Sequence, residues 1–286
     1  MTDVLSKLGK RTLVMGILNV TPDSFSDGGR FYALADALAH ARRLIAEGAD
    51  ILDIGGESTR PGAEPISLDE ELCRVVPVVR AVRQEFPHIP ISIDTYKATV
   101  AEAALEAGAT ILNDISALRF DPQMVKVAAR ARVPVVLMHM KGDPRTMQQN
   151  PTYDDVVGEI KAFLRERIAF ARSMGIEQIW IDPGIGFGKR VSHNLEILRR
   201  LSELQDLECP ILIGTSRKFF IGRLGTARAE PLPVTERLEG TIASTVIAVL
   251  NGAQIVRVHD VAPMKKALAI ADAVRYGWEE ERYAQP

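Results

Sequence analysis

GADILDIG, residues 48–55, joins the end of a helical pattern to a short apolar run. The same junction recurs at residues 108–111 (GATI) and 252–255 (GAQI), and a looser copy lies at Gly175-Ile176 before Ile179. Glycine suits the left-handed residue that ends a helix. An apolar run too short for a helix suits a strand that is buried on both faces. The chain therefore repeats a unit in which a helix leads into a buried strand.

Eight apolar runs predict eight strands, which start near Leu13, Ile51, Ile91, Ile111, Val135, Ile179, Ile211 and Ile255. Helical patterns separate them. Residues 67–70 are typical of a capping box that opens a helix. Asp121-Pro122 is typical of an N-cap followed by proline at the first helical position. Residues 97–107 and 261–276 have the apolar spacing of helices. Eight alternating pairs favour the α/β class and a closed (β/α)8 TIM barrel. The alternative is an open doubly wound sheet, but no Gly-x-Gly-x-x-Gly follows the first strand to favour it.

The length and charge of the chain narrow its class. A TIM barrel takes about 250 residues, so 286 residues fit one domain over residues 1–286, and no linker suggests a second. Lys and Arg number 35 and Asp and Glu 37, a net charge of −2. This balance gives no reason to expect nucleic acid or a membrane surface as a partner.

The cysteines and the apolar segments bear on the compartment. Two cysteines, Cys73 and Cys209, are too few for a disulfide framework and favour a reducing compartment. Residues 1–11 lack the apolar segment of a signal peptide, and no apolar run approaches the ~20 residues of a membrane helix. We expect a soluble, cytoplasmic protein.

Polar residues stand where the predicted strands end, which is the end of a TIM barrel that carries active sites. From the first strand to the eighth they are Asn19, Asp53, Asp94, Asn113-Asp114, His139, Asp182, Gly214-Thr215-Ser216-Arg217-Lys218 and Arg257-Val258-His259. Polar groups facing away from water cost free energy unless they are paired. Because every predicted strand delivers one to the same rim, we interpret that rim as a functional site.

The rim combines acceptors with cations. Asp94, Asn113 and Asp182 suit a flat heterocycle with several N–H donors, because a carboxylate can accept two parallel N–H bonds. The ends of strands seven and eight suit a phosphate, and the cationic group there consists of Arg217, Lys218, Arg257 and His259. Asn19, beside strand eight, is a candidate oxygen ligand for Mg²⁺, which takes few protein ligands. The long polar loops at residues 21–30 and 55–65 are suited to close over a substrate.

Several features have plain structural interpretations. Gly184–Lys189 (GIGFGK) looks like a phosphate loop but matches neither the Walker nor the Rossmann spacing, and it is typical of a tight turn. His139 suits a satisfied core histidine, His193 a helix-capping role and Cys73 packing on an apolar helix face. The apolar run Ile242–Leu250 suits a closely packed helix or a subunit contact.

Taken together, the motifs resemble those of dihydropteroate synthases over nearly the whole chain. The two most specific are Met15–Gly29 (MGILNVTPDSFSDGG) and Asp53–Gly62 (DIGGESTRPG). The similarity continues through residues 92–95 (SIDT), 113–115 (NDI), 139–142 (HMKG), 182–189 (DPGIGFGK), 214–218 (GTSRK), 236–241 (ERLEGT) and 257–260 (RVHD). No motif position departs from the family pattern.

The resemblance implies roles for particular residues. The pterin ring is implied to bind to Asp94, Asn113, Asp182 and Lys218. The diphosphate is implied to bind to Arg257, His259 and Asn19, with Asn19 touching Mg²⁺, and Thr59 and Arg60 contact the pterin diphosphate. The p-aminobenzoate pocket is implied to contain Phe25, Pro61, Phe187, Ser216 and Lys218. Of these, Asp94, Lys218, Arg257 and His259 are the expected catalytic residues.

The resemblance also implies the reaction: 6-hydroxymethyl-7,8-dihydropterin diphosphate and p-aminobenzoate condense to 7,8-dihydropteroate and pyrophosphate in folate biosynthesis. Breaking the bond between the pterin methylene carbon and the diphosphate separates positive from negative charge, which the site has to stabilise. We therefore expect a dissociative, SN1-like loss of pyrophosphate assisted by Mg²⁺, Arg257 and His259. Sulfonamides mimic p-aminobenzoate, which makes the chain similar to a sulfonamide target. Family members dimerise through their last helices, which implies a homodimer.

Three other functions compete with this one. A pterin-binding module of a methyltetrahydrofolate:corrinoid methyltransferase shares the barrel and the acceptors, but it has no need for cations around a diphosphate. A barrel metallohydrolase usually needs a His-x-His pair after the first strand, where this chain has Leu18-Asn19-Val20. A binding-only homologue without turnover is the third, and the complete polar rim argues against it.

Overall fold

The computed structural model describes residues 4–20, 29–58, 62–227 and 230–277. The strands are β1 (Leu13–Asn19), β2 (Ile51–Gly55), β3 (Ile91–Asp94), β4 (Ile111–Asp114), β5 (Val135–Met138), β6 (Ile179–Asp182), β7 (Leu212–Ile213) and β8 (Ile255–Val258). The α-helices are α1 (Gly29–Ala46), α2 (Leu68–Glu85), α3 (Ala98–Glu106), α4 (Met124–Ala131), α5 (Val156–Ser173), α6 (Val191–Arg199), α7 (Phe219–Leu224), α8 (Leu238–Leu250) and α9 (Val261–Tyr276). Short 3-10 turns are η1 (Leu5–Lys7), η3 (Leu201–Leu207) and η4 (Val234–Glu236).

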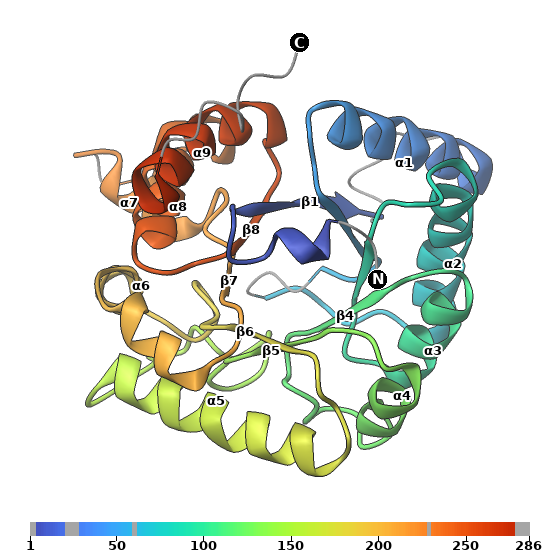
Figure 1. Ribbon diagram of the computed structural model, residues 1–286, viewed down its shortest axis with the longest axis horizontal. Helices are drawn as coiled ribbons and strands as arrows, with labels where there is room; N and C mark the ends of the chain where they lie inside the picture. Colours follow the sequence, from blue (N-terminus) through green and yellow to red (C-terminus); the bar gives the residue numbers. More distant parts are fainter. Residues whose placement is uncertain (1–3, 21–28, 59–61, 228–229, 278–286) are drawn as a thin grey trace.

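The strands form one parallel barrel inside a ring of helices (Figure 1). They are paired in the order β6-β5-β4-β3-β2-β1-β8-β7. A parallel bridge between Ile181 and Ile211 joins the two ends of that order, and the Ile181 amide donates to the Pro210 carbonyl at 2.9 Å. The closed (β/α)8 barrel is therefore confirmed and the open doubly wound sheet is wrong. The described residues form a single domain, and its expected extent over residues 1–286 stays a prediction.

Seven of the eight predicted strand starts are confirmed, and the eighth differs by one residue. Ile211 enters the isolated bridge to Ile181, so the regular strand β7 begins at Leu212. Glycine has the expected role at the helix-to-strand junctions. Gly48, Gly108 and Gly252 have φ angles of 98°, 118° and 114°, each two residues beyond the end of a helix.

Two local predictions are wrong. Asp121-Pro122 does not start a helix, because α4 begins at Met124 and the Asp121 carboxylate instead accepts from the amides of Ala98 and Gln123. Cys73 is exposed rather than packed, since the buried face of α2 runs through residues 71, 75, 78, 79 and 82. The Ser67 cap is confirmed: its side chain accepts from the Glu70 amide at 3.2 Å.

Alternating strand residues build two cores. The inward set fills the barrel and consists of Leu13, Met15, Ile51, Ile111, Val136, Trp180, Leu212 and Ile255. The outward residues pack against the helices in a second, larger cluster. Three side chains of the N-terminal segment, Val4, Leu5 and Leu8, pack on the inward set, and η1 crosses the middle of the barrel in Figure 1. The interior is thus filled toward the strand beginnings, which leaves the opposite end for polar groups.

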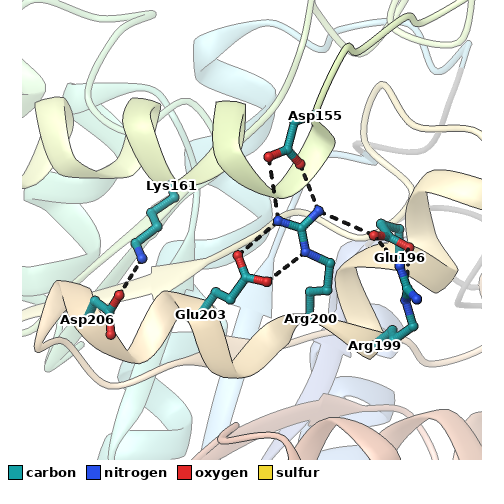
Figure 2. A network of polar contacts seen from close by, with 7 residues as sticks. All are labelled: Asp155, Lys161, Glu196, Arg199, Arg200, Glu203 and Asp206. Carbon is teal, nitrogen blue, oxygen red and sulfur yellow. Dashed lines mark hydrogen bonds and ion pairs between the residues drawn. The ribbon is translucent and has the colours of Figure 1, made fainter.

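Charged side chains tie helix α5 to α6 and η3 on the surface (Figure 2). Arg200 pairs with Asp155 at 2.9 Å, Glu203 at 2.7 Å and Glu196 at 3.3 Å. A separate pair joins Lys161 to Asp206 in the same region. Exposed ion pairs each contribute little to stability, so we assign this network no part in the chemistry at the barrel mouth.

Candidate active site

Arg257 lies at the centre of the polar rim. Its Nε donates to Asp53 Oδ2 at 2.5 Å and its Nη2 to Asp94 Oδ2 at 2.7 Å. Asp53 is fully buried, and the Asn113 amide nitrogen lies 3.4 Å from both of its carboxylate oxygens. Strands β2, β3, β4 and β8 thus bring four polar side chains into one connected group.

Charge and burial compete in this group. Burial raises the pKa of Asp94 to about 7, against the attraction of Arg257, and the nearby negative charge of Asp53 raises it further. Burial acts to lower the pKa of Arg257, but the carboxylates of Asp53 and Asp94 outweigh it and keep the guanidinium charged. The site therefore holds a permanent cation beside a carboxyl group that titrates near neutrality.

Asp182, at the end of β6, anchors a second group. Its carboxylate accepts from the Gly184 amide at 2.7 Å. Burial raises the pKa of Asp182 to about 6, although that hydrogen bond and the charges of Lys218 and Lys189 act to lower it. The Lys218 ammonium lies 4.2 Å from the centre of the Phe187 ring. A carboxylate, a cation and an aromatic face therefore meet on this side of the mouth.

Lys189 is buried behind Asp182. Its ammonium nitrogen lies 3.0 Å from the Phe187 carbonyl, 3.3 Å from the His139 carbonyl and 3.0 Å from His139 Nδ1. Burial lowers the pKa of Lys189 to about 7 and, together with the Lys189 charge, lowers that of His139 to about 2. His139 is therefore neutral at all ordinary pH values, and Lys189 joins the end of β5 to the loop after β6.

The loops after β7 and β8 are joined by a serine and a histidine. Ser216 Oγ lies 2.9 Å from His259 Nδ1 and accepts from the His259 amide at 3.2 Å. Arg217 has a φ of 58°, which is uncommon outside glycine. Its guanidinium binds both oxygens of Asp260, at 2.9 and 2.5 Å. This loop is held in a defined conformation that presents Ser216 and His259 together.

An apolar cluster lies beside these polar groups. Ile115, Met138, Met140 and Met147 are buried together, with Tyr96 and Phe187 packed against them. Carboxylates that accept N–H bonds, an apolar wall and fixed cations together suit a flat, hydrogen-bonding ring that carries an anionic group.

The comparisons with known proteins identify the family. The sequence pattern of the family described as pterin binding enzymes matches residues 15–259. A relative from Synechocystis sp., a dihydropteroate synthase, is 51% identical over 268 residues, which cover 93% of this chain and 91% of the relative. The chain belongs to the dihydropteroate synthase family. It is accordingly a transferase of folate synthesis.

Solved dihydropteroate synthase structures share the fold closely. One from Yersinia pestis, in complex with a sulfonamide drug, has a TM-score of 0.86 and 47% identity, covering 93% of this chain and 94% of that one. One from Xanthomonas albilineans, with 4-aminobenzoic acid, has a TM-score of 0.85 and 46% identity, covering 96% and 94%. The family fold therefore extends over nearly the whole of both chains.

The structure brings together most of the site residues expected for a dihydropteroate synthase. Those that lie at the barrel mouth are Asn19, Asp94, Asn113, Asp182, Phe187, Ser216, Lys218, Arg257 and His259. Phe25, Thr59, Arg60 and Pro61 lie outside the described residues, so their expected roles stay predictions. Arg217, expected in the cationic group, pairs with Asp260 in the loop after β8, and its expected part in binding the anion stays a prediction. His193 does have the expected capping role, accepting from the Arg190 amide.

Two site residues were missed as such from the sequence. The sequence places Asp53 at the rim but assigns it no ligand, although strand alternation puts it on the same inward face as Ile51, which fills the barrel. For Lys189 the sequence predicts only a place in a tight turn. Its signal was a lysine at the end of a glycine-rich run, but burial of that lysine depends on the strand β5 beside it and is not visible locally.

The residues present fit the expected Mg²⁺. Asn19 is the last residue of β1, half-buried, and pairs in register with Gly55, whose own neighbour in β3 is Asp94. Among the described residues, no three His, Cys, Asp or Glu side chains gather as a metal site. A single amide oxygen suits an ion that keeps most of its waters and is held largely by substrate phosphates.

Proposed function

We propose that this protein condenses 6-hydroxymethyl-7,8-dihydropterin diphosphate with p-aminobenzoate to give 7,8-dihydropteroate and pyrophosphate. The observation that carries this proposal is the meeting of Asp94 and Asp182 with Arg257 and Lys218 at one mouth. The names of the relatives support it, as does the 4-aminobenzoic acid complex of the Xanthomonas albilineans relative.

The carboxylates bind the pterin ring. A pterin edge presents N–H donors, and ionised Asp182 and Asp94 accept them in charge-assisted hydrogen bonds. Asn113 adds an amide, and the apolar cluster around Met138 and Met140 covers the ring face. The negative charge of the two carboxylates also favours positive charge that develops on the ring and its methylene carbon.

The cations bind the leaving group. Arg257 is charged at every working pH, and His259 lies beside Ser216 on the next loop. Asn19 would hold Mg²⁺, which when bound supplies further positive charge for the phosphate oxygens. The residues thus oppose the charge that accumulates on pyrophosphate as it departs.

We propose a dissociative order of bond changes. The bond between the pterin methylene carbon and the diphosphate oxygen breaks first, and both electrons leave with pyrophosphate. The aniline nitrogen of p-aminobenzoate then bonds to that carbon and loses a proton to solvent. No covalent enzyme intermediate is needed, and the described mouth is lined by groups that bind charge.

The second substrate would occupy the outer part of the mouth. Phe187 and Lys218 form a cation–aromatic pair there, and Ser216 lies on the adjoining loop, which suits an aromatic carboxylate. Phe25 and Pro61 are proposed to complete this pocket. Since sulfonamides mimic p-aminobenzoate, the sulfonamide complex of the Yersinia pestis relative supports the proposal that this protein is also a sulfonamide target.

Arg257→Ala tests the assignment of the diphosphate. It should weaken binding of the pterin diphosphate far more than binding of the bare hydroxymethyl pterin, because the guanidinium pairs with phosphate and not with the ring. Calorimetric titration of both ligands, with Mg²⁺ present, measures the difference. Equal losses for the two ligands would contradict the assignment and favour a methyltransferase-type pterin module.

We also propose a homodimer in the cytoplasm. Four large apolar side chains are 47–70% exposed on the adjacent helices α8 and α9: Ile247, Leu250, Ile270 and Val274. Each pair is spaced three or four residues apart and so shares a helix face. A second copy of the chain would cover this apolar surface. The proposed compartment rests on the small number of cysteines, Cys73 and Cys209, which are too few for a disulfide framework.

A further inference from the structure

We propose that Asp53 is a positioning residue that holds Arg257 from the barrel interior. The guanidinium then keeps its position when the substrate binds Asp94. This inference rests on the proposed function, because it assigns Asp94 to the pterin and Arg257 to the diphosphate. Asp53 itself touches neither substrate.

The geometry separates the two partners of Arg257. Asp53 is fully buried, whereas the Asp94 side chain is 12% exposed and ends its strand at the mouth. Asp53 binds the inner nitrogen of the guanidinium, Nε, and Asp94 binds an outer one, Nη2. A ligand entering the mouth therefore reaches Asp94, while the Asp53 contact stays out of its reach.

Asp94 binds Arg257 in the ligand-free protein and is proposed to bind the pterin ring in the complex. In the ligand-free protein one of its oxygens accepts from Arg257. When ring N–H groups bind Asp94, that hold on Arg257 weakens, and a buried guanidinium without a fixed partner is strongly unfavourable. Asp53, steadied by the nearby Asn113 amide, supplies the partner that does not change. The Arg257 plane is thereby held ready for the diphosphate.

Asp53 also has an electrostatic effect on Asp94. The charged groups that face Asp94 are Arg257 from β8, Asp53 from β2, Glu71 from α2 and Asp114 from β4. Asp53→Asn removes a negative charge that repels ionised Asp94. It also leaves Asp94 as the only carboxylate of this pair that attracts Arg257. Both changes favour ionised Asp94, so its pKa falls toward the ordinary range.

Asp50 offers a matched control for this idea. It lies next to the start of β2, is also buried, and binds a guanidinium with both oxygens, Arg11 at 2.8 and 2.5 Å. It stands at the opposite end of the barrel, beside the strand beginnings. Asp50→Asn and Asp53→Asn therefore each break an Asp–Arg pair of the same short segment, and only the second pair lies at the mouth.

The test compares Asp53→Asn and Asp50→Asn with the wild type in p-aminobenzoate-dependent pyrophosphate release across pH. Asp53→Asn should lower kcat/KM for the pterin diphosphate by about 10²-fold and move the acid limb of the pH profile to lower pH. Asp50→Asn should lower thermal stability and leave both kinetic readouts unchanged. Failure of the wild type to release pyrophosphate would contradict the proposed function, whereas equal kinetics in the two variants would overturn the role of Asp53 alone.

A double variant covers the case in which Asp53→Asn folds poorly. Asp53→Asn with Arg257→Ala removes both members of the buried pair and leaves no uncompensated guanidinium. If Asp53 acts through Arg257, the double variant loses no more activity than Arg257→Ala alone. Losses that multiply would show that Asp53 acts by another route and would overturn the proposal.

Discussion

Asp94 and Asp182 are carboxyl groups that the fold makes hard to ionise. Burial raises their pKa values to about 7 and about 6, well above the ordinary value near 3.9. The folded chain therefore binds these two protons more tightly than the unfolded chain. Their contribution to stability is fully present below about pH 4, the unfolded-state pKa, and is lost progressively as the pH rises from there through 6 and 7. Pterin binding needs the ionised forms, so affinity should rise over the same window.

Asp182→Asn separates these opposed effects. The amide carries no charge to desolvate and can still accept from the Gly184 amide, so the ligand-free protein should gain up to about 3 kcal/mol of stability at pH 8. Pterin affinity should fall by about 10-fold to 100-fold, because an amide cannot accept two N–H bonds. Denaturant unfolding and calorimetry measure the two changes. Unchanged pterin binding would refute the assignment of Asp182.

The loop between β6 and α6 shows how one glycine fixes the shape of a site. Gly184 has a φ of 70°, and a Cβ atom there would lie 1.9 Å from the His139 carbonyl oxygen. Gly175, at the junction before β6, has a φ of 85° and nothing within 4 Å of its Cβ position. Any other residue would be strained by the positive φ at either position. Only at Gly184 would its Cβ atom also clash with a neighbouring atom.

Gly184→Ala and Gly175→Ala form a matched pair. Gly175→Ala should cost about 1–2 kcal/mol from backbone strain and leave pterin affinity unchanged. Gly184→Ala should cost about 3 kcal/mol or more and also weaken pterin binding, because the loop must move away from β5 and takes Asp182 and Phe187 with it. Thermal unfolding and calorimetry distinguish the two. Similar results for both variants would show that the close approach at Gly184 is unimportant.

The sequence predicts the regular elements well because their signals are local. An apolar run ended by glycine marks a buried strand wherever it occurs, and seven strand starts are confirmed. The failures depend on distant partners. α4 begins at Met124, and Asp121 before it also accepts from the distant Ala98 amide. β7 is shorter because Ile211 pairs with β6 only through an isolated bridge.

The site divides in the same way between local and distant information. Residues that end strands, such as Asp94 and Asp182, follow from counting along each strand. The ion-pair partner of each arginine does not follow from the sequence: Arg217 and Arg257 look alike there, yet Arg217 binds Asp260 and Arg257 binds Asp53 and Asp94. Only the closed barrel, which places β8 across from β2 and β3, settles that difference.

The assembly of the molecule can be tested through helix α9. Ile270→Glu combined with Val274→Glu places two charges in the proposed dimer surface, where both side chains are 70% exposed in the single chain. The wild type should sediment as a dimer and this variant as a monomer with unchanged thermal stability of the fold. Leu195→Glu, at an exposed apolar position on α6, should remain dimeric. A monomeric wild type, or a dimeric double variant, would contradict the proposed surface.

The barrel as a whole is proposed to bring a ring, its diphosphate and an aniline to one mouth. The most direct measurement is a coupled assay for pyrophosphate release from 6-hydroxymethyl-7,8-dihydropterin diphosphate in the presence of Mg²⁺, with p-aminobenzoate varied. We predict saturable dependence on p-aminobenzoate and one dihydropteroate formed for each pyrophosphate. No release of pyrophosphate, or release without formation of dihydropteroate, would contradict the account.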